Sequence, residues 1–177
     1  LVVDQTSHFD GDWREGQKHA PTILAFETVD GIQVSFAEIS TAYDGVTLQR
    51  LLAIAPGTNG RNYIIDIVRA LGTREHTFDL PIHFKGQLIE TKFDMTHETA
   101  QLEPFGLENG YQHLWKRSES ELLNGAQETS WLLGDQFYTL SFASDQAVTT
   151  YLTELGANDP EHNLRREQAF VLRTSGQ

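Results

Sequence analysis

The sequence predicts an all-β fold, an antiparallel β-sandwich of about ten strands with short hairpin connections. Three observations favour this fold. Apolar and polar residues alternate along most of the chain, turn signals interrupt the alternation at short intervals, and no segment has the period of a long amphipathic helix. Alternation over four to eight residues is typical of half-buried strands, and many short strands between tight turns are typical of sandwiches.

The expected strands are the segments in which apolar residues recur at every second position. These segments are 32–36, 46–54, 63–67, 78–84, 111–115, 131–133, 137–142 and 169–173. The β-branched run 148–151 also favours a strand, whereas 91–108 lacks a clear period and is expected to be a long loop or an irregular edge. Turn signals such as Asp30-Gly31, Asp44-Gly45, Asn109-Gly110 and Asn124-Gly125 separate these segments.

The length of 177 residues suits a single domain. Leu1-Val2-Val3-Asp4 is expected to be part of a strand that begins before Leu1, and a polar turn follows it. We therefore expect one C-terminal β-sandwich domain over residues 1–177, truncated at its N-terminal edge.

The charge and the composition exclude several classes of partner and site. A formal net charge of −12 and a pI near 4.9 argue against nucleic acid and against an anionic membrane surface, since both need clustered Lys and Arg. The chain contains no cysteine, which excludes disulfides and thiolate metal sites. No apolar run approaches the roughly 20 residues that span a bilayer as a helix.

Candidate chemistry begins with the seven histidines, none of which forms an H-E-x-x-H pair. A strand would place His8 and Asp10 on one face, where they could line a site, although two ligands do not make a zinc site. The alternative for both is a structural role in a turn. The chain also lacks the G-x-S-x-G, P-loop and dinucleotide-binding motifs.

Two further segments are rich in groups that recognise sugars. In a strand, Tyr111, His113 and Trp115 share one face, and such rings stack on pyranose faces while their polar atoms bind hydroxyl groups; the alternative is an aromatic core strand. The segment 156–167 contains Asn163, Arg165 and a second arginine. Arginine can bind a carboxylate through two hydrogen bonds, although a solvated loop with local ion pairs is the alternative.

Five motifs together resemble one family. They are Leu1-Val2-Val3-Asp4-Gln5-Thr6-Ser7-His8-Phe9-Asp10-Gly11, Tyr43-Asp44-Gly45-Val46, His76-Thr77-Phe78-Asp79-Leu80-Pro81-Ile82-His83-Phe84, Asn109-Gly110-Tyr111-Gln112-His113-Leu114-Trp115, and Asn158-Asp159-Pro160 with Asn163-Leu164-Arg165. This pattern is similar to the C-terminal part of heparinase II/III-like polysaccharide lyases and, within that group, to oligoalginate lyases.

The resemblance implies a parent enzyme that cleaves uronic-acid polysaccharides by β-elimination. In that enzyme, an N-terminal (α/α) toroid is joined to a C-terminal β-sandwich. The family's catalytic tyrosine lies in the toroid, and its catalytic histidine and zinc ligands precede Leu1. We therefore expect no catalytic or metal-binding residue in this fragment, zinc only in the parent enzyme, and no activity of the fragment alone.

The same resemblance gives the remaining expectations. The substrate-binding candidates are His8, Asp10, Tyr111, His113, Asn163 and Arg165. The expected partners are an acidic oligosaccharide or polysaccharide and the toroid of the same polypeptide, and a homodimer is compatible with the pattern. The expected location is the bacterial periplasm or the exterior.

Two other interpretations stay open. A free-standing carbohydrate-binding module would begin with a linker rather than inside a strand. A scaffold that stabilises the toroid or a dimer would expose an apolar patch on one sheet, and this interpretation is compatible with the lyase.

Overall fold

The computed structural model describes residues 1–98, 102–155 and 167–177. These residues form 14 strands, one α-helix of four residues, α1 (Trp13–Gly16), and three 3₁₀ turns, η1 (His8–Gly11), η2 (Thr58–Gly60) and η3 (Tyr111–His113). Wherever the register is defined, neighbouring strands run antiparallel. The all-β prediction is confirmed. Eleven of the strands are longer than three residues, close to the expected ten.

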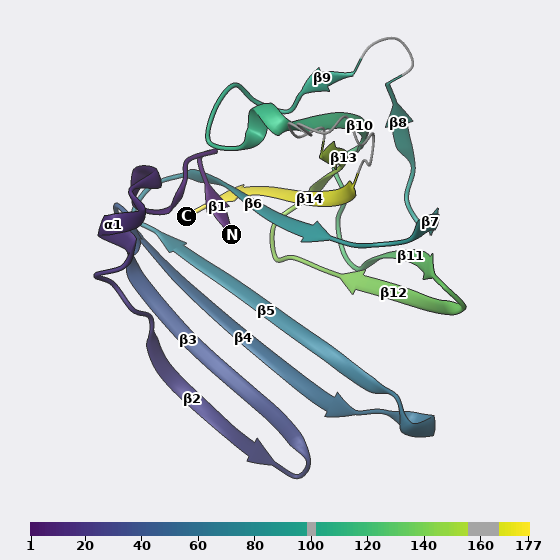
Figure 1. Cartoon of the computed structure of the whole chain (residues 1–177), viewed down its shortest axis with the longest axis horizontal. Helices are drawn as coiled ribbons and strands as arrows, with labels where there is room; N and C mark the ends of the chain where they lie inside the picture. Colours follow the sequence, from purple (N-terminus) through teal and green to yellow (C-terminus); the bar gives the residue numbers. More distant parts are fainter. Residues whose placement is uncertain (99–101, 156–166) are drawn as a thin grey trace. The chain divides into compact units, whose positions relative to one another are not determined.

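The chain divides into two compact units. Unit 2 comprises Thr6–His76 and Gln177. It is built on one four-stranded sheet, β2 (Thr22–Val29), β3 (Ile32–Tyr43), β4 (Val46–Pro56) and β5 (Asn62–Gly72), arranged in chain order (Figure 1). Asp30 and Gly31 both have positive φ, 50° and 81°, as the tight turn between β2 and β3 requires.

Unit 1 comprises Leu1–Gln5 and Thr77–Gly176 and contains two sheets. The larger has the order β1-β6-β14-β13-β10-β8, with β9 also paired to β10, and the smaller has the order β12-β11-β7. The strands are β1 (Val2–Val3), β6 (His76–His83), β7 (Gln87–Thr91), β8 (Met95–His97), β9 (Glu103–Pro104), β10 (Leu114–Ser120), β11 (Gln127–Leu133), β12 (Gln136–Phe142), β13 (Thr149–Leu155) and β14 (Glu167–Gly176).

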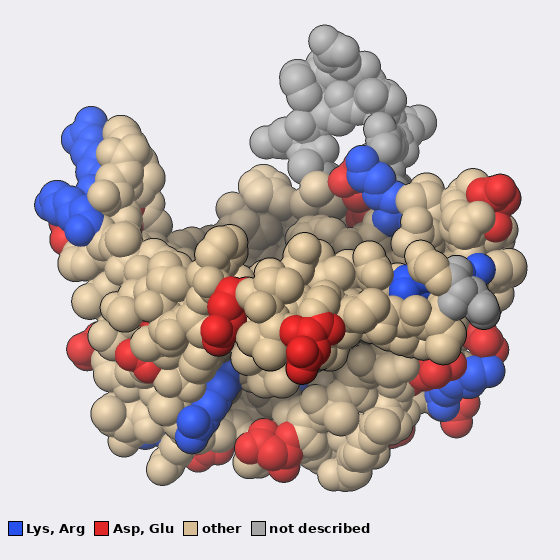
Figure 2. All heavy atoms as spheres, turned by 90° about the horizontal axis from the view of Figure 1, so that it is seen from below, with Lys and Arg blue, Asp and Glu red and all other residues tan. Residues whose placement is uncertain are grey.

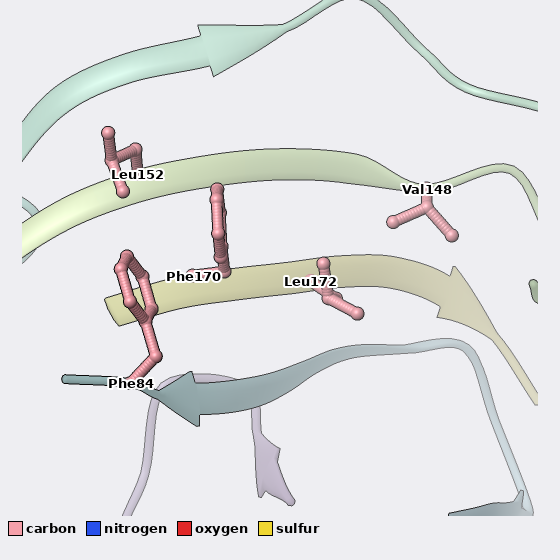
Figure 3. Close-up of a cluster of buried hydrophobic side chains, with 5 residues drawn as sticks. All are labelled: Phe84, Val148, Leu152, Phe170 and Leu172. Atoms are coloured by element: carbon pink, nitrogen blue, oxygen red, sulfur yellow. The ribbon is translucent and has the colours of Figure 1, made fainter. Parts of the chain in front are cut away.

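The two sheets of unit 1 pack face to face around one hydrophobic core. Its buried residues are Phe84, Val148, Leu152, Phe170 and Leu172 (Figure 3). Half-buried side chains from both sheets pack against them: Leu80, Ile82, Leu88, Met95, Trp131 and Phe142. Apolar side chains on two facing sheets exclude water between them, which makes unit 1 a sandwich in its own right.

Strand β14 is buried on both of its faces. Phe170 and Leu172 point into the core, and the alternate residues Ala169 and Val171 are also buried, on the opposite face. This explains its unbroken apolar run, because a strand covered on both sides needs no polar alternation.

The structure differs from the sequence analysis in two segments. The segment 91–108, expected to lack regular structure, contains the short edge strands β8 and β9. Residues 111–113, expected to begin a strand, form η3 instead, and the strand starts only at Leu114.

Charged groups are scattered over the surface. On the face shown in Figure 2, Asp and Glu side chains lie among broad uncharged areas, and Lys and Arg occur in separate small groups. Among the described residues, no helix has the length and apolar character needed to cross a membrane.

Gly86 is a position where a side chain is expected to destabilise unit 1. Its φ is +102°, and an added Cβ would overlap the backbone carbonyl group of Leu132 on β11. We expect Gly86→Ala to lower the free energy of unfolding by about 1–3 kcal/mol, measured by urea denaturation. The control is Gly134→Ala, where φ is +64° and nothing lies within 4 Å of an added Cβ. Equal losses in both variants would show that close approach to β11 is unimportant.

Candidate functional site

The N-terminal segment of unit 2 is a compact turn rather than a strand. Within η1, Phe9 and Asp10 both adopt left-handed backbone conformations, with φ of 53° and 51°. The Asp12 side chain then caps α1, accepting hydrogen bonds from the backbone N–H of Arg14 at 2.8 Å and of Glu15 at 3.3 Å.

The Glu15 carboxylate contacts the side chains of two consecutive residues, Lys18 and His19. One of its oxygens accepts a hydrogen bond from Lys18 Nζ at 2.5 Å, and the other lies 3.0 Å from His19 Nε2. The hydrogen bond from Lys18, followed by that from His19, lowers the pKa of Glu15 below its usual value. The Phe9 ring stacks on His19 with 5.1 Å between ring centroids, which fixes the imidazole from its other side.

Lys18 and His19 line a small polar pocket in unit 2. Its volume is about 270 Å³, and it is lined by Lys18, His19, Ala20, Thr22, Glu38, Ile39, Ser40 and Thr41. The Glu38 carboxylate accepts a hydrogen bond of 2.6 Å from Gln49 Nε2. The lysine ammonium group, the imidazole, the hydroxyl groups and the carboxylate together suit a ligand that carries both hydroxyl groups and a negative charge.

His8 and Asp10 lie near this pocket in sequence but do not line it. Both side chains are exposed. His8 makes an edge-on contact with the Tyr43 ring at 4.9 Å between centroids, and Tyr43 Oη donates a hydrogen bond to the Thr6 carbonyl oxygen at 3.1 Å. The expectation that His8 and Asp10 share a strand face was wrong, because the left-handed residues of η1 break the extended backbone.

Tyr111 is a buried structural residue of unit 1. It belongs to η3, and its hydroxyl donates a hydrogen bond of 2.6 Å to Asp79 Oδ2. The expectation that Tyr111, His113 and Trp115 line one strand face was wrong, because Asn109 and Gly110 have φ of 56° and 90° and turn the chain into a 3₁₀ turn. His113 is half-buried at the end of this turn.

Asp79, Tyr111 and Arg173 form a buried polar network. Arg173 Nε and Nη2 donate to the two oxygens of Asp79, each at 2.7 Å. Burial alone would lower the pKa of Arg173, but the hydrogen bonds to Asp79 and its charge outweigh burial and raise it. The guanidinium also lies over the rings of Phe105 at 4.7 Å and Tyr151 at 5.3 Å.

This network was not predicted from the sequence. The signal was present, since Asp79 lies between Phe78 and Leu80 and Arg173 follows Leu172, and a charged residue among apolar ones in a buried strand needs a partner. The network stabilises unit 1, and the buried Asp79 side chain accepts three hydrogen bonds within it.

Asn163 and Arg165 lie outside the described residues. Over residues 1–98, 102–155 and 167–177, no three His, Asp or Glu side chains are grouped closely enough to hold a metal ion. The donors in this part of the chain therefore do not fit a zinc site with its three or four ligands.

Comparison with known proteins finds similarity along the whole chain. It is 39% identical over 178 aligned residues to an alginate lyase of Stenotrophomonas maltophilia, an alignment that covers 100% of this chain and 24% of that protein. It is 35% identical to an exo-oligoalginate lyase of Saccharophagus degradans, covering 98% of this chain and 24% of that protein. The chain thus spans about a quarter of the length of these relatives. No protein family model matches it.

Proposed function

We propose that the chain is one part of a lyase that cleaves alginate or its oligosaccharides. The observation that supports this is the uninterrupted similarity, 39% and 35% identity, to a segment of two proteins named for that activity. The all-β architecture agrees with the β-sandwich of heparinase II/III-like lyases, the family that the sequence motifs resemble.

The proposed reaction is β-elimination. A base removes the proton at C5 of a uronate whose carboxylate is neutralised, the bond between C4 and the glycosidic oxygen breaks, and an acid protonates the departing oxygen. The product carries a C4–C5 double bond. We assign the acid, the base and any zinc ion to the part of the enzyme outside these 177 residues, together with the (α/α) toroid, and we propose a periplasmic or secreted location.

The contribution we propose for this chain is substrate contact at the polar pocket of unit 2. Lys18 Nζ has two N–H donors besides the one that Glu15 accepts, and these suit a uronate carboxylate, while the hydroxyl groups of Thr22, Ser40 and Thr41 suit sugar hydroxyl groups. These donors stand out because the whole chain carries a charge of −12, which by itself repels a polyanionic sugar.

The activity is tested by incubating the longer polypeptide that carries this chain with alginate oligosaccharides and following the ultraviolet absorbance of the unsaturated product. We expect the absorbance to rise with time. A folded polypeptide that binds the oligosaccharides without cleaving them would overturn the proposed lyase and favour a carbohydrate-binding module.

Lys18→Ala in that polypeptide is expected to raise KM about tenfold and leave kcat nearly unchanged, since one charge-assisted hydrogen bond to the substrate carboxylate is lost. The control is Lys92→Ala. Lys92 is also exposed and is paired with a carboxylate, that of Glu90 at 2.8 Å, but it does not line the pocket. If the two variants have equal KM values, the pocket does not contact the substrate.

A further inference from the structure

Three Asn-Gly pairs occur in the chain, at residues 59–60, 109–110 and 124–125. Asparagine is one of the thermally labile residues, and a following glycine leaves the next main-chain nitrogen unshielded and its backbone free to rotate. The structure describes the side chains of Asn109 and Asn124, and both are exposed. Because the two pairs consist of the same residues, a difference in their reactivity has to come from the fold around them.

Asn124 lies in the exposed connection between β10 and β11. Leu123, just before it, pairs with Val148 through two main-chain hydrogen bonds of 2.8 and 2.9 Å. The main-chain carbonyl oxygen of Asn124 accepts a hydrogen bond of 3.0 Å from Gln127 Nε2, and its side-chain amide is not tethered to any described residue. Gly125 has a φ of +72°, and nothing lies within 4 Å of a Cβ added there. Solvent and the Gly125 nitrogen can therefore both reach the side-chain amide.

Asn109 is held in place by its side chain and by the turn around it. Its Nδ2 donates a hydrogen bond of 3.1 Å to the main-chain carbonyl oxygen of Gln5. Asn109 and Gly110 have φ of 56° and 90°, and the main-chain N–H of Tyr111 donates to the carbonyl oxygen of Glu108 at 3.0 Å, which closes the turn. Both the amide and the main chain that would have to approach it are thus fixed.

We propose that Asn124 is a site of spontaneous deamidation in unit 1, and that the fold protects Asn109 from the same reaction. Base in the solvent removes the proton from the main-chain nitrogen of Gly125, and this nitrogen attacks Cγ of Asn124. The new N–Cγ bond closes a cyclic imide, while the bond between Cγ and Nδ2 breaks and the amide nitrogen takes up a proton and leaves as ammonia. Water then opens the ring. Opening at Cγ gives aspartate at this position, and opening at the main-chain carbonyl carbon gives isoaspartate.

The modification changes charge and main-chain length at one place in unit 1. Either product adds a negative charge to a chain whose net charge is already −12, and isoaspartate also lengthens the main chain by one methylene group just before β11. The connection lies outside the buried core cluster of unit 1. The folded chain therefore tolerates the change, and the acidic form accumulates as the molecule ages.

The test follows both pairs in one sample of the 177-residue chain. The folded chain is incubated at mildly alkaline pH, and a parallel sample is incubated in guanidinium chloride. Trypsin then releases Asn109 in the peptide 93–116 and Asn124 in the peptide 118–165. Mass spectrometry with fragmentation measures the fraction of each asparagine in which oxygen has replaced the amide nitrogen. Asn124→Gln is the control variant, because its longer side chain does not form the same ring.

In the folded chain, we expect Asn124 to convert about tenfold or more faster than Asn109, and in guanidinium chloride we expect similar rates at both positions, because local structure no longer protects Asn109. In the Asn124→Gln variant, the acidic form of the folded chain should no longer accumulate. Equal rates in the folded chain, or conversion of Asn124 only after unfolding, would overturn the proposal. Slow conversion of Asn109 in guanidinium chloride would also contradict it, since protection would then not come from the fold.

Discussion

Asp79→Asn is expected to lower the free energy of unfolding of unit 1 by about 3–5 kcal/mol, because it leaves the Arg173 guanidinium without its counter-charge. Asp79 is only 1% exposed, and its two oxygens accept both hydrogen bonds from Arg173 as well as the one from Tyr111. The amide keeps the shape of the side chain but removes its charge and one acceptor. Urea denaturation followed by tyrosine and tryptophan fluorescence measures the loss.

Asp66→Asn is a matched control for this variant. Arg50 contacts both oxygens of Asp66, at 2.9 and 2.7 Å, so the geometry is similar, but this pair is exposed to solvent. Water screens it, and we expect a loss of about 0–1 kcal/mol. If the two variants lose the same stability, burial does not determine the strength of these ion pairs.

Phe170→Ala is expected to cost about 3–5 kcal/mol of unfolding free energy, the usual range for removing a fully buried aromatic ring. Phe170 is 1% exposed and stacks on Phe84 with 5.3 Å between ring centroids, at the centre of the unit 1 core (Figure 3). The cavity left behind is enclosed by both sheets and cannot collapse without distorting β14.

The control for the core variant is Phe137→Ala on β12. Phe137 belongs to the same unit but is 65% exposed, so we expect its loss to change stability by about 0.5 kcal/mol or less. A small effect of Phe170→Ala, comparable to that of Phe137→Ala, would mean that the two sheets of unit 1 are not packed as described.

Much of the fold is predictable because alternation reports directly on strand faces. The pattern of 78–84 places Leu80, Ile82 and Phe84 on one side, and these side chains do share the core. Alternation fails at residues 111–113, which form the 3₁₀ turn η3. The positive φ of Asn109 and Gly110 would suit a hairpin turn equally well, so the dipeptide marks a turn without saying which structure follows it. In the folded chain, Tyr111 of this turn donates a hydrogen bond to Asp79.

The candidate site is less predictable because its residues are brought together by hydrogen bonds rather than by a motif. Lys18 and His19 carry no signal in the sequence, and both of their side chains are held by hydrogen bonds to Glu15, which lies in the short helix that Asp12 caps. His8 is favoured by its place in a recognisable motif, yet it packs against Tyr43 outside the pocket lining. Glu38 lies on β3 and lines the pocket only because the folded sheet brings it close to Lys18 and His19, which the sequence alone does not show.

The most direct test of the central claim compares product formation by the 177-residue chain and by the longer polypeptide, at equal concentration and with the same alginate oligosaccharides. We expect unsaturated uronate to accumulate with the longer polypeptide and not with the shorter chain. Accumulation with the shorter chain alone would contradict this expectation, because the acid and the base would then lie within these 177 residues.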